Sequence, residues 1–186
     1  MSAPFNGDVF IAAEVLRLRD KRGITRAVET GTYMGHTSRW LAQNFQKVWT
    51  VESRSDFFTQ SGENLRGIEN LTRFCGNSVE TIGALGREII DGAFVYLDAH
   101  WGYEWPLQSE LSAIAQCGAK PVILIHDFCV PGSNLGFDSY GGHRLDLEYV
   151  TPGMDAIYGA GQWEHHYNDA EHAGGSRRGV LYVEPV

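Results

Sequence analysis

Residues 28–35 are Val28-Glu29-Thr30-Gly31-Thr32-Tyr33-Met34-Gly35, an acidic turn between an expected strand and an expected helix. Gly31 and Gly35 let the backbone adopt positive φ angles or approach a ligand closely, because glycine has no Cβ atom. Open α/β sheets bind ligands in the crevice outside the carboxyl ends of their strands. The same spacing also occurs in plain strand-to-helix turns. Other residues of the chain are therefore needed to distinguish a ligand-binding turn from a plain one.

The composition predicts one globular domain that spans residues 1–186, with 43% hydrophobic and 20% charged residues. The start of the sequence lacks the pattern of an export signal, so we expect a cytoplasmic protein without membrane partners. The formal charge of −8 disfavours nucleic-acid binding, which depends on contacts between cations and phosphates. Cys75, Cys117 and Cys129 lack the paired spacing of a disulfide framework or a zinc site.

Strand and helix patterns alternate along most of the chain. The expected strands are 24–28, 47–51, 71–75, 92–97, 121–125, 163–167 and 179–184, and the expected helices are 11–19, 37–45, 55–65, 79–85 and 107–115. This alternation predicts an α/β fold: a doubly wound, Rossmann-like, mostly parallel sheet with helices on both faces. We expect an N-terminal helical segment over residues 1–23 and an active-site loop over residues 131–143.

Polar side chains recur where the expected strands end. They are Glu29, Glu52, Asn77-Ser78, Asp98-Ala99-His100 and His126-Asp127. Because the carboxyl ends of parallel strands share one edge, we expect these residues around one crevice. Glu52 follows Gly31 by about 21 residues, a spacing at which an acid binds the ribose of a nucleotide held by the first turn. A solvated loop carboxylate is the alternative for Glu52.

These residues resemble the class I S-adenosylmethionine-dependent methyltransferases over roughly residues 24–130. The matching motifs are Glu29-x-Gly31-x-x-x-Gly35, Glu52, Gly76-Asn77-Ser78 and Asp98, in the family's order. The resemblance implies a seven-stranded sheet in the order 3-2-1-4-5-7-6, which ends in an antiparallel hairpin of the last two strands.

The resemblance also implies the cofactor contacts. Glu29, Gly31, Thr32, Tyr33 and Gly35 would surround the methionine portion of S-adenosylmethionine, and Glu52 would bind the ribose. Asn77 and Ser78 would border the adenine, and Asp98 would complete the cofactor site. Many members of the family have aspartate where this chain has Asn77, so the adenine contact differs from the usual pattern.

Asp98-Ala99-His100 and His126-Asp127 resemble the acidic positions of metal-dependent O-methyltransferases, both the catechol type and those that act on sugars of natural products. If their strands are neighbours, about 4.8 Å apart, Asp98 and Asp127 can converge on one Mg²⁺ or Mn²⁺ ion, which prefers oxygen ligands. His126 is the third candidate ligand, although a residue before Asp127 in an extended strand should point to the opposite face. If only one of Asp98 and Asp127 lay at this edge, we would expect that carboxylate to have a structural role and not to bind a metal.

Asp98 and His100 are the candidate catalytic residues. A bound cation would lower the pKa of a substrate hydroxyl, and His100 would accept its proton, because imidazole titrates near neutral pH. The alternative for His100 is a structural role, as a loop histidine that is hydrogen-bonded to a carbonyl group. An aromatic set either forms an acceptor pocket or caps the sheet. Its members are Trp101, Tyr103, Trp105, Phe128, Phe137 and Tyr140.

The sequence thus predicts an S-adenosylmethionine-dependent methyltransferase that modifies a hydroxyl of a small molecule or sugar with the help of a divalent cation. A nicotinamide-dependent oxidoreductase is the first alternative, because it would also place a ribose at Glu52, but residues 30–35 lack the third glycine of its usual turn. A noncatalytic module that binds a partner through the aromatic loop is the second. Residues 131–143 or a second subunit of a homo-oligomer could hold part of a large acceptor.

Overall fold

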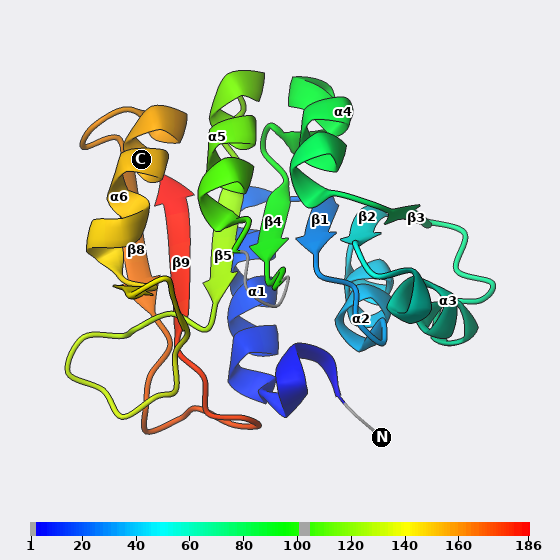
Figure 1. Cartoon of the computed structure of the whole chain (residues 1–186), viewed down its shortest axis with the longest axis horizontal. Coiled ribbons are helices and arrows are strands. Elements are labelled where there is room, and N and C mark those ends of the chain that lie inside the picture. Colours follow the sequence, from blue (N-terminus) through cyan, green and yellow to red (C-terminus); the bar gives the residue numbers. More distant parts are fainter. Residues whose placement is uncertain (1–2, 101–104) are drawn as a thin grey trace.

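The computed structural model describes residues 3–100 and 105–186. Seven strands form one sheet in the order β3-β2-β1-β4-β5-β9-β8 (Figure 1). They are β1 (Arg26–Thr30), β2 (Lys47–Glu52), β3 (Leu71–Cys75), β4 (Phe94–Leu97), β5 (Val122–His126), β8 (Trp163–Tyr167) and β9 (Val180–Pro185). Strands β1 to β5 are parallel, and β9 is antiparallel to both of its neighbours.

The expected strand order is confirmed. Strands β8 and β9 are the sixth and seventh strands of this sheet, because β6 and β7 belong to a separate two-stranded sheet. The order is therefore 3-2-1-4-5-7-6 when the strands of the main sheet are counted along the chain.

Helices cover both faces of the sheet, as expected. They are η1 (Pro4–Gly7), α1 (Val9–Arg22), α2 (His36–Asn44), α3 (Ser55–Asn64), α4 (Ser78–Ile90), α5 (Leu107–Cys117) and α6 (Leu147–Tyr158). Alternate strand residues divide the core in two, since side chains alternate between the faces of a strand. Val95 and Ile123 pack with α4, α5 and α6 on one face, while Phe94 and Leu124 pack with α1 and α2 on the other (Figure 1). Within the described residues, no helix has the length and apolar character needed to cross a bilayer.

The segment after β5 differs from the expected plain loop. Residues 131–143 include β6 (Ser139–Tyr140) and the first residue of the short strand β7 (His143–Arg144), which pairs with β6. Helix α6 was not expected, because proline and glycine break most helices and Pro152-Gly153 lies inside it. Burial of Val150, Met154 and Ile157 against the core stabilises the helix despite this pair.

An ion-pair cluster ties the end of α1 to the last strand. The Glu184 side chain is 3% exposed, and its carboxylate accepts hydrogen bonds from Lys21 Nζ at 3.0 Å and Arg22 Nε at 2.6 Å. Burial alone would raise the pKa of Glu184, but the hydrogen bonds from Arg22 and Lys21 outweigh burial and lower it. Because the folded pKa lies below the unfolded one, this cluster stabilises the fold above the usual glutamate pKa of about 4.3 and ceases to do so in acid.

We therefore expect Glu184→Gln to lower the free energy of unfolding at pH 7 by about 1–2 kcal/mol, since it removes two charge-assisted hydrogen bonds. Chemical denaturation of the wild type and the variant should give a difference that shrinks as the pH falls below about 4. Glu164→Gln is the matched control, because the Glu164 side chain is 58% exposed and lies 3.6 Å from the same Lys21. An equal loss in both variants would contradict the structural role of Glu184.

Candidate active site

A cavity of about 630 Å³ lies along the carboxyl edge of the sheet. Most of its wall is built from residues at or just after the carboxyl ends of five neighbouring strands. In spatial order from β3 to β5 these are Gly76 and Ser78, Glu52 to Arg54, Gly31 and Tyr33, Asp98 to His100, and Asp127. The cavity therefore runs across the strand ends, and its volume falls in the range of small-molecule and cofactor sites.

Gly31 lies at the middle of this cavity, in the turn that follows β1. Its φ angle is +86°, and a Cβ atom there would lie 2.5 Å from the backbone oxygen of Asp98. Its N–H donates to the carbonyl of Val51 at 3.0 Å. Only glycine fits this position, because the turn is wedged between the ends of β2 and β4.

Glu52 is fixed on the cavity wall by backbone donors. The Tyr33 N–H donates to Oε2 at 2.8 Å, and the Arg54 N–H donates to Oε1 at 2.9 Å. Both carboxylate oxygens retain acceptor capacity, since an ionised carboxylate can accept about four hydrogen bonds. Tyr33 has a φ angle of +47° and packs edge-on against Phe57, another residue of the wall.

Four predicted cofactor residues are not part of the wall in the described portion of the chain: Glu29, Thr32, Gly35 and Asn77. Gly35 packs against Leu65, where a Cβ atom would come within 2.9 Å of the side chain. Asn77 Oδ1 caps α4 by accepting the N–H groups of Val79 and Glu80. These two residues position the turn and the helix, and their direct contact with a cofactor stays a prediction.

Glu29 lies inside the fold, behind the turn. Its carboxylate accepts hydrogen bonds from the Ser38 hydroxyl and from Thr50 Oγ1, the latter at 2.7 Å, and Thr50 also bonds Thr32. Burial raises the pKa of Glu29 to about 8, although the bonds from Ser38 and Thr50 oppose the shift. Glu29 and Thr32 therefore support the turn from within. Strand periodicity does not distinguish such a residue from one that lines the cavity.

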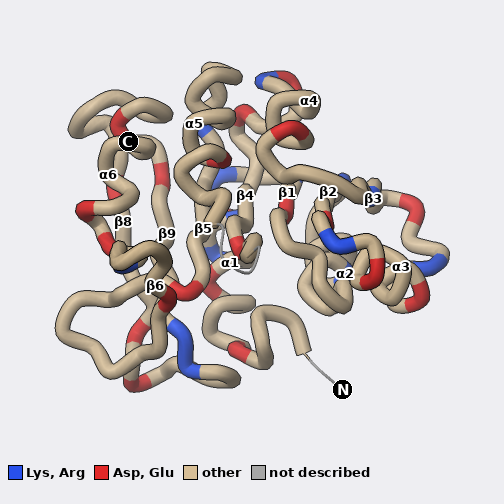
Figure 2. The backbone as a smooth tube through the Cα atoms, viewed as in Figure 1, with Lys and Arg blue, Asp and Glu red and all other residues tan. Residues whose placement is uncertain are grey.

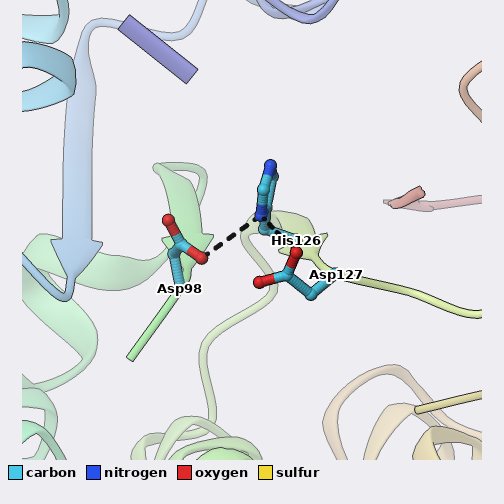
Figure 3. Close-up of side chains that lie close together, drawn as sticks. All are labelled: Asp98, His126 and Asp127. Atoms are coloured by element: carbon cyan, nitrogen blue, oxygen red, sulfur yellow. Dashed lines mark ion pairs between the residues drawn. The ribbon is translucent and has the colours of Figure 1, made fainter. Parts of the chain in front are cut away.

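Asp98, His126 and Asp127 converge at the β4–β5 end of the cavity (Figure 3). His126 Nδ1 lies 3.4 Å from Asp98 Oδ1 and 3.2 Å from Asp127 Oδ1. The Tyr96 hydroxyl donates to Asp98 Oδ2 at 2.8 Å. One ligand atom from each of the three residues lies within 4.8 Å of the others, as expected for neighbouring strands.

The expectation that His126 faces away from Asp127 is wrong. Asp127 has a φ angle of +60°, so the chain leaves its extended conformation directly after β5 and the simple alternation of side chains ends there. His126 is buried, and neither of its ring nitrogens has a hydrogen-bond partner of good geometry among the described residues. A buried polar group without a hydrogen-bond partner lowers the stability of the fold, so a bound ligand or ion would be expected to interact with His126.

His100 joins this cluster to a second carboxylate. Its Nε2 lies 3.1 Å from Asp127 Oδ2, while its Nδ1 lies 2.8 Å from the Tyr140 hydroxyl and 3.2 Å from Asp138 Oδ2. Arg178 donates to both Asp127 and Asp138. Figure 2 shows a short basic stretch beside acidic positions below β5 and β9.

Sequence analysis missed Asp138 and Arg178. Asp138 lies in the segment after β5, where no strand end marks it, and Arg178 follows a glycine pair shortly before β9. Only the fold brings them together, through the backbone pairing of Gly136 with residues 177–179. The sequence contains no local signal that would have identified either residue.

Asp98 and Asp127 raise the pKa values of both histidines. Burial alone would lower the pKa of His100, but hydrogen bonds to Asp127 and Asp98 outweigh it and raise the pKa to about 11. Burial would also lower the pKa of His126, but the charge of Asp98 and the hydrogen bond to Asp127 outweigh burial and raise this pKa. The expectation that His100 titrates near neutral pH is therefore wrong for this arrangement, in which the imidazole holds its proton.

The aromatic residues near the site divide between two roles. Trp105 stacks on Tyr149 with ring centroids 4.6 Å apart and packs against Tyr140, which bonds His100. Phe128 is fully buried and packs against Tyr167, so it belongs to the core. Phe137 is 39% exposed and does not line the described part of the cavity. Trp101 and Tyr103 lie outside the described residues.

Solved structures of several methyltransferases share this fold. The chain is similar to the O-methyltransferase TomG from Streptomyces achromogenes, involved in tomaymycin synthesis, with a TM-score of 0.66 and 15% identity over 93% of this chain and 78% of that one. It is also similar to an O-methyltransferase from Bacillus cereus, with a TM-score of 0.65 and 15% identity over 93% and 79% of the two chains.

A third similar structure is CalS10, an amino pentose methyltransferase from Micromonospora echinaspora. Its TM-score is 0.60, with 14% identity over 94% of this chain and 90% of that one. No family model matches the sequence, and a search of curated proteins gives no significant match. At this level of identity, the three likenesses establish the fold and leave the reaction to be argued from the site.

We expect Gly31→Ala to destabilise the protein more than Gly67→Ala. Both glycines have positive φ angles, +86° and +77°, so alanine costs roughly 1 kcal/mol of backbone strain at either position. Only at Gly31 does the new methyl group meet backbone, at the Asp98 carbonyl, whereas nothing lies within 4 Å at Gly67. Crowding should add about 1–3 kcal/mol in denaturant unfolding. Equal losses in the two variants would disprove the wedged turn.

Proposed function

We propose that this protein is an S-adenosylmethionine-dependent methyltransferase that methylates a hydroxyl group of a small molecule or sugar. One observation carries the proposal: a single cavity joins the fixed carboxylate of Glu52 to the cluster of Asp98, His100 and Asp127, with the Gly31 backbone between them. Such a cavity suits an elongated ligand whose ribose binds near one end and whose reactive group lies at the other.

The order of the strands supports this placement of the cofactor. Ser78 lies on the β3 side, where the adenine would bind, and Glu52 follows as acceptor for the ribose hydroxyls. Gly31 would bring bare backbone to the methionine portion, and the methyl group would then lie near Asp98. Of the proteins with this fold, TomG and CalS10 were solved with S-adenosylmethionine and the Bacillus cereus enzyme with S-adenosylhomocysteine.

The alternatives fit the site less well. A nicotinamide dinucleotide needs a cradle for its pyrophosphate, whereas the first turn here is wedged against β4 and lacks the third glycine of that cradle. A noncatalytic module has no use for three carboxylates gathered at the end of a cavity. Such a cluster costs desolvation energy and is typical of functional sites.

The donor set also fits a divalent cation. Asp98, Asp127 and His126 offer two carboxylates and an imidazole whose buried nitrogens make no well-formed hydrogen bond with any described residue, and Mg²⁺ or Mn²⁺ accepts such ligands. A bound cation would lower the pKa of a coordinated substrate hydroxyl. With the charge of Asp98 and Asp127 thus compensated, the protonated form of His100 would be favoured less strongly.

Contacts at Nδ1 orient the His100 ring so that Nε2 is available for proton transfer. Tyr140 and Asp138 hold Nδ1, which leaves Nε2 directed toward Asp98 and Asp127. Bound S-adenosylmethionine would supply an electrophilic methyl group, and S-adenosylhomocysteine would leave with the electron pair of the broken carbon–sulfur bond. Nε2 of His100 would take the proton of the acceptor hydroxyl as its oxygen bonds the methyl carbon.

Calorimetric titration with S-adenosylhomocysteine tests the cofactor. The wild type should bind it, and Glu52→Gln should bind it about tenfold more weakly, because a neutral amide is a poorer acceptor for the ribose hydroxyls. Glu63→Gln is the matched control, since Glu63 is exposed and its partner among the described residues is Arg66. A folded wild type that binds NADH but not S-adenosylhomocysteine would refute the proposal.

Electron paramagnetic resonance of added Mn²⁺ tests the metal. Asp98→Asn and Asp127→Asn should each weaken Mn²⁺ binding at least about tenfold, because each removes a charged ligand, while the affinity for S-adenosylhomocysteine stays within about threefold. Asp169→Asn is the control, as Asp169 is exposed and pairs with His172. Unchanged Mn²⁺ binding in both site variants would remove the metal from the mechanism and leave the cofactor proposal intact.

A further inference from the structure

An N-terminal arm, residues 4–8, contributes to the same cavity although no sequence motif marks it. Asn6 is part of the cavity wall together with Gly31 and Asp98. The arm consists of the short helix η1 and the N-cap of α1, and in Figure 1 it lies on the side of the sheet toward which β1 and β4 point.

The arm is anchored to the core through Phe5, whose side chain is 1% exposed. The Phe5 ring packs edge-on against Trp40 of α2 and Tyr96 of β4, with centroids 5.1 and 5.4 Å away. Its N–H donates to Thr37 Oγ1 at 3.0 Å. These contacts fix the residue directly before Asn6.

The loop between β8 and β9 holds the arm from the other side. Gly174 donates its N–H to Asp8 Oδ2 at 3.0 Å, while Asp8 Oδ1 caps α1. A Cβ atom on Gly175 would lie 2.2 Å from the Asn6 carbonyl oxygen, so the two backbones touch where only glycine fits. Asn6 is thus fixed on both sides.

The arm is also strained. Phe5, Asn6 and Gly7 have consecutive φ angles of +50°, +54° and +86°, and left-handed conformations are unfavourable for residues other than glycine. Strain of this kind persists only where the surroundings impose it, and it concentrates at binding sites. Asparagine tolerates the left-handed region better than most residues, which suits it to present an amide group here.

Two contacts place Asn6 at a defined part of the cavity. Thr37, which binds Phe5, lies in the first turn of α2, directly after the turn of residues 31–35. Tyr96, which packs on Phe5, donates its hydroxyl to Asp98. Asn6 therefore lies beside the turn and Asp98, away from Glu52 and Ser78 at the β2–β3 side.

We propose that the Asn6 side chain hydrogen-bonds the amino-acid end of the cofactor, and this inference rests on the proposed function. In the cofactor placement given above, that end lies beside the turn. It carries an α-carboxylate and an α-ammonium group. A primary amide suits both, because its NH₂ group donates to a carboxylate and its oxygen accepts from an ammonium group. The N-terminal arm would then select ligands that carry an amino-acid group.

Two ligands distinguish this role from a general effect on the cavity. S-adenosylhomocysteine carries the amino-acid group, whereas 5′-methylthioadenosine has the same nucleoside and thioether but lacks that group. In calorimetry, Asn6→Gly should weaken binding of S-adenosylhomocysteine about tenfold and leave 5′-methylthioadenosine within about twofold of the wild type. Glycine is the chosen replacement because it accepts the φ angle of +54° without strain.

A second variant tests the charge, and a third is the control. Asn6→Asp keeps the shape of the side chain but replaces its donor with a negative charge. It should weaken binding of S-adenosylhomocysteine by more than Asn6→Gly where the amide donates to the α-carboxylate, and should retain binding where the amide oxygen accepts from the α-ammonium group. Asn44→Ala, in the last turn of α2, should change neither affinity, because the Asn44 amide bonds the Trp40 carbonyl. Thermal unfolding of each variant checks that the arm stays folded.

Each outcome decides between the proposals. Unchanged affinity of Asn6→Gly for S-adenosylhomocysteine, with normal binding by the wild type, overturns the role of Asn6 and leaves the proposed function standing. An equal loss for both ligands also overturns it, since the amino-acid group would then not be the group recognised. A folded wild type that binds neither ligand overturns the proposed function and this inference together.

Discussion

The close approach of the Gly31 backbone to the Asp98 carbonyl is the constraint on which the rest of the site depends. Gly31 also donates to Val51, so one residue connects the ends of β1, β2 and β4. This packing brings Glu52, the last residue of β2, and Asp98, which follows β4, to opposite sides of one turn. Glu29, Ser38 and Thr50 hold the turn from inside the fold, and a carboxyl group buried there is tolerated because hydroxyl groups bond it. The backbone contact between Gly31 and Asp98 determines the shape of the cavity, and the side chains around that contact determine its chemistry.

Charge balance is the second constraint, and it acts at the β4–β5 end. Asp98, Asp127 and Asp138 bring three negative charges into a partly buried space, whereas Arg178 supplies one permanent positive charge. Protons on His100 and His126 supply the rest in the arrangement described, which explains why both pKa values are raised. A divalent cation could supply the same charge. The cluster therefore favours positive charge whatever its source, and this preference is a physical reason to expect metal binding that is independent of any family resemblance.

The strand ends could be predicted because parallel strands impose a repeating pattern, in which Glu52, Asp98 and Asp127 each follow a recognisable apolar strand. The remaining features depend on contacts that sequence patterns do not encode. Helix α6 contains Pro152-Gly153 and is stabilised by its packing, so its local sequence argues against it. The left-handed conformation of Asp127 brings its carboxylate to the His126 ring instead of the opposite face. Asp138, Arg178 and Asn6 reach the site from segments without strand signals. Glu29 lies near the end of β1 and points inward, although its place before the turn resembles that of a ligand contact.

The loop between β8 and β9 connects the N-terminal arm to the acidic cluster. Gly174 and Gly175 hold the N-terminal arm and so position Asn6, and three residues later Arg178 binds Asp127 and Asp138. Asn168 fixes the base of the loop by bonding the backbone of Arg178 and Val180. Because β9 is antiparallel to β5, this loop enters the sheet at the same edge where the parallel strands end. The antiparallel strand thus brings a late segment of the chain to a site otherwise built by the first five strands, and one loop supports both the arm and the acidic cluster.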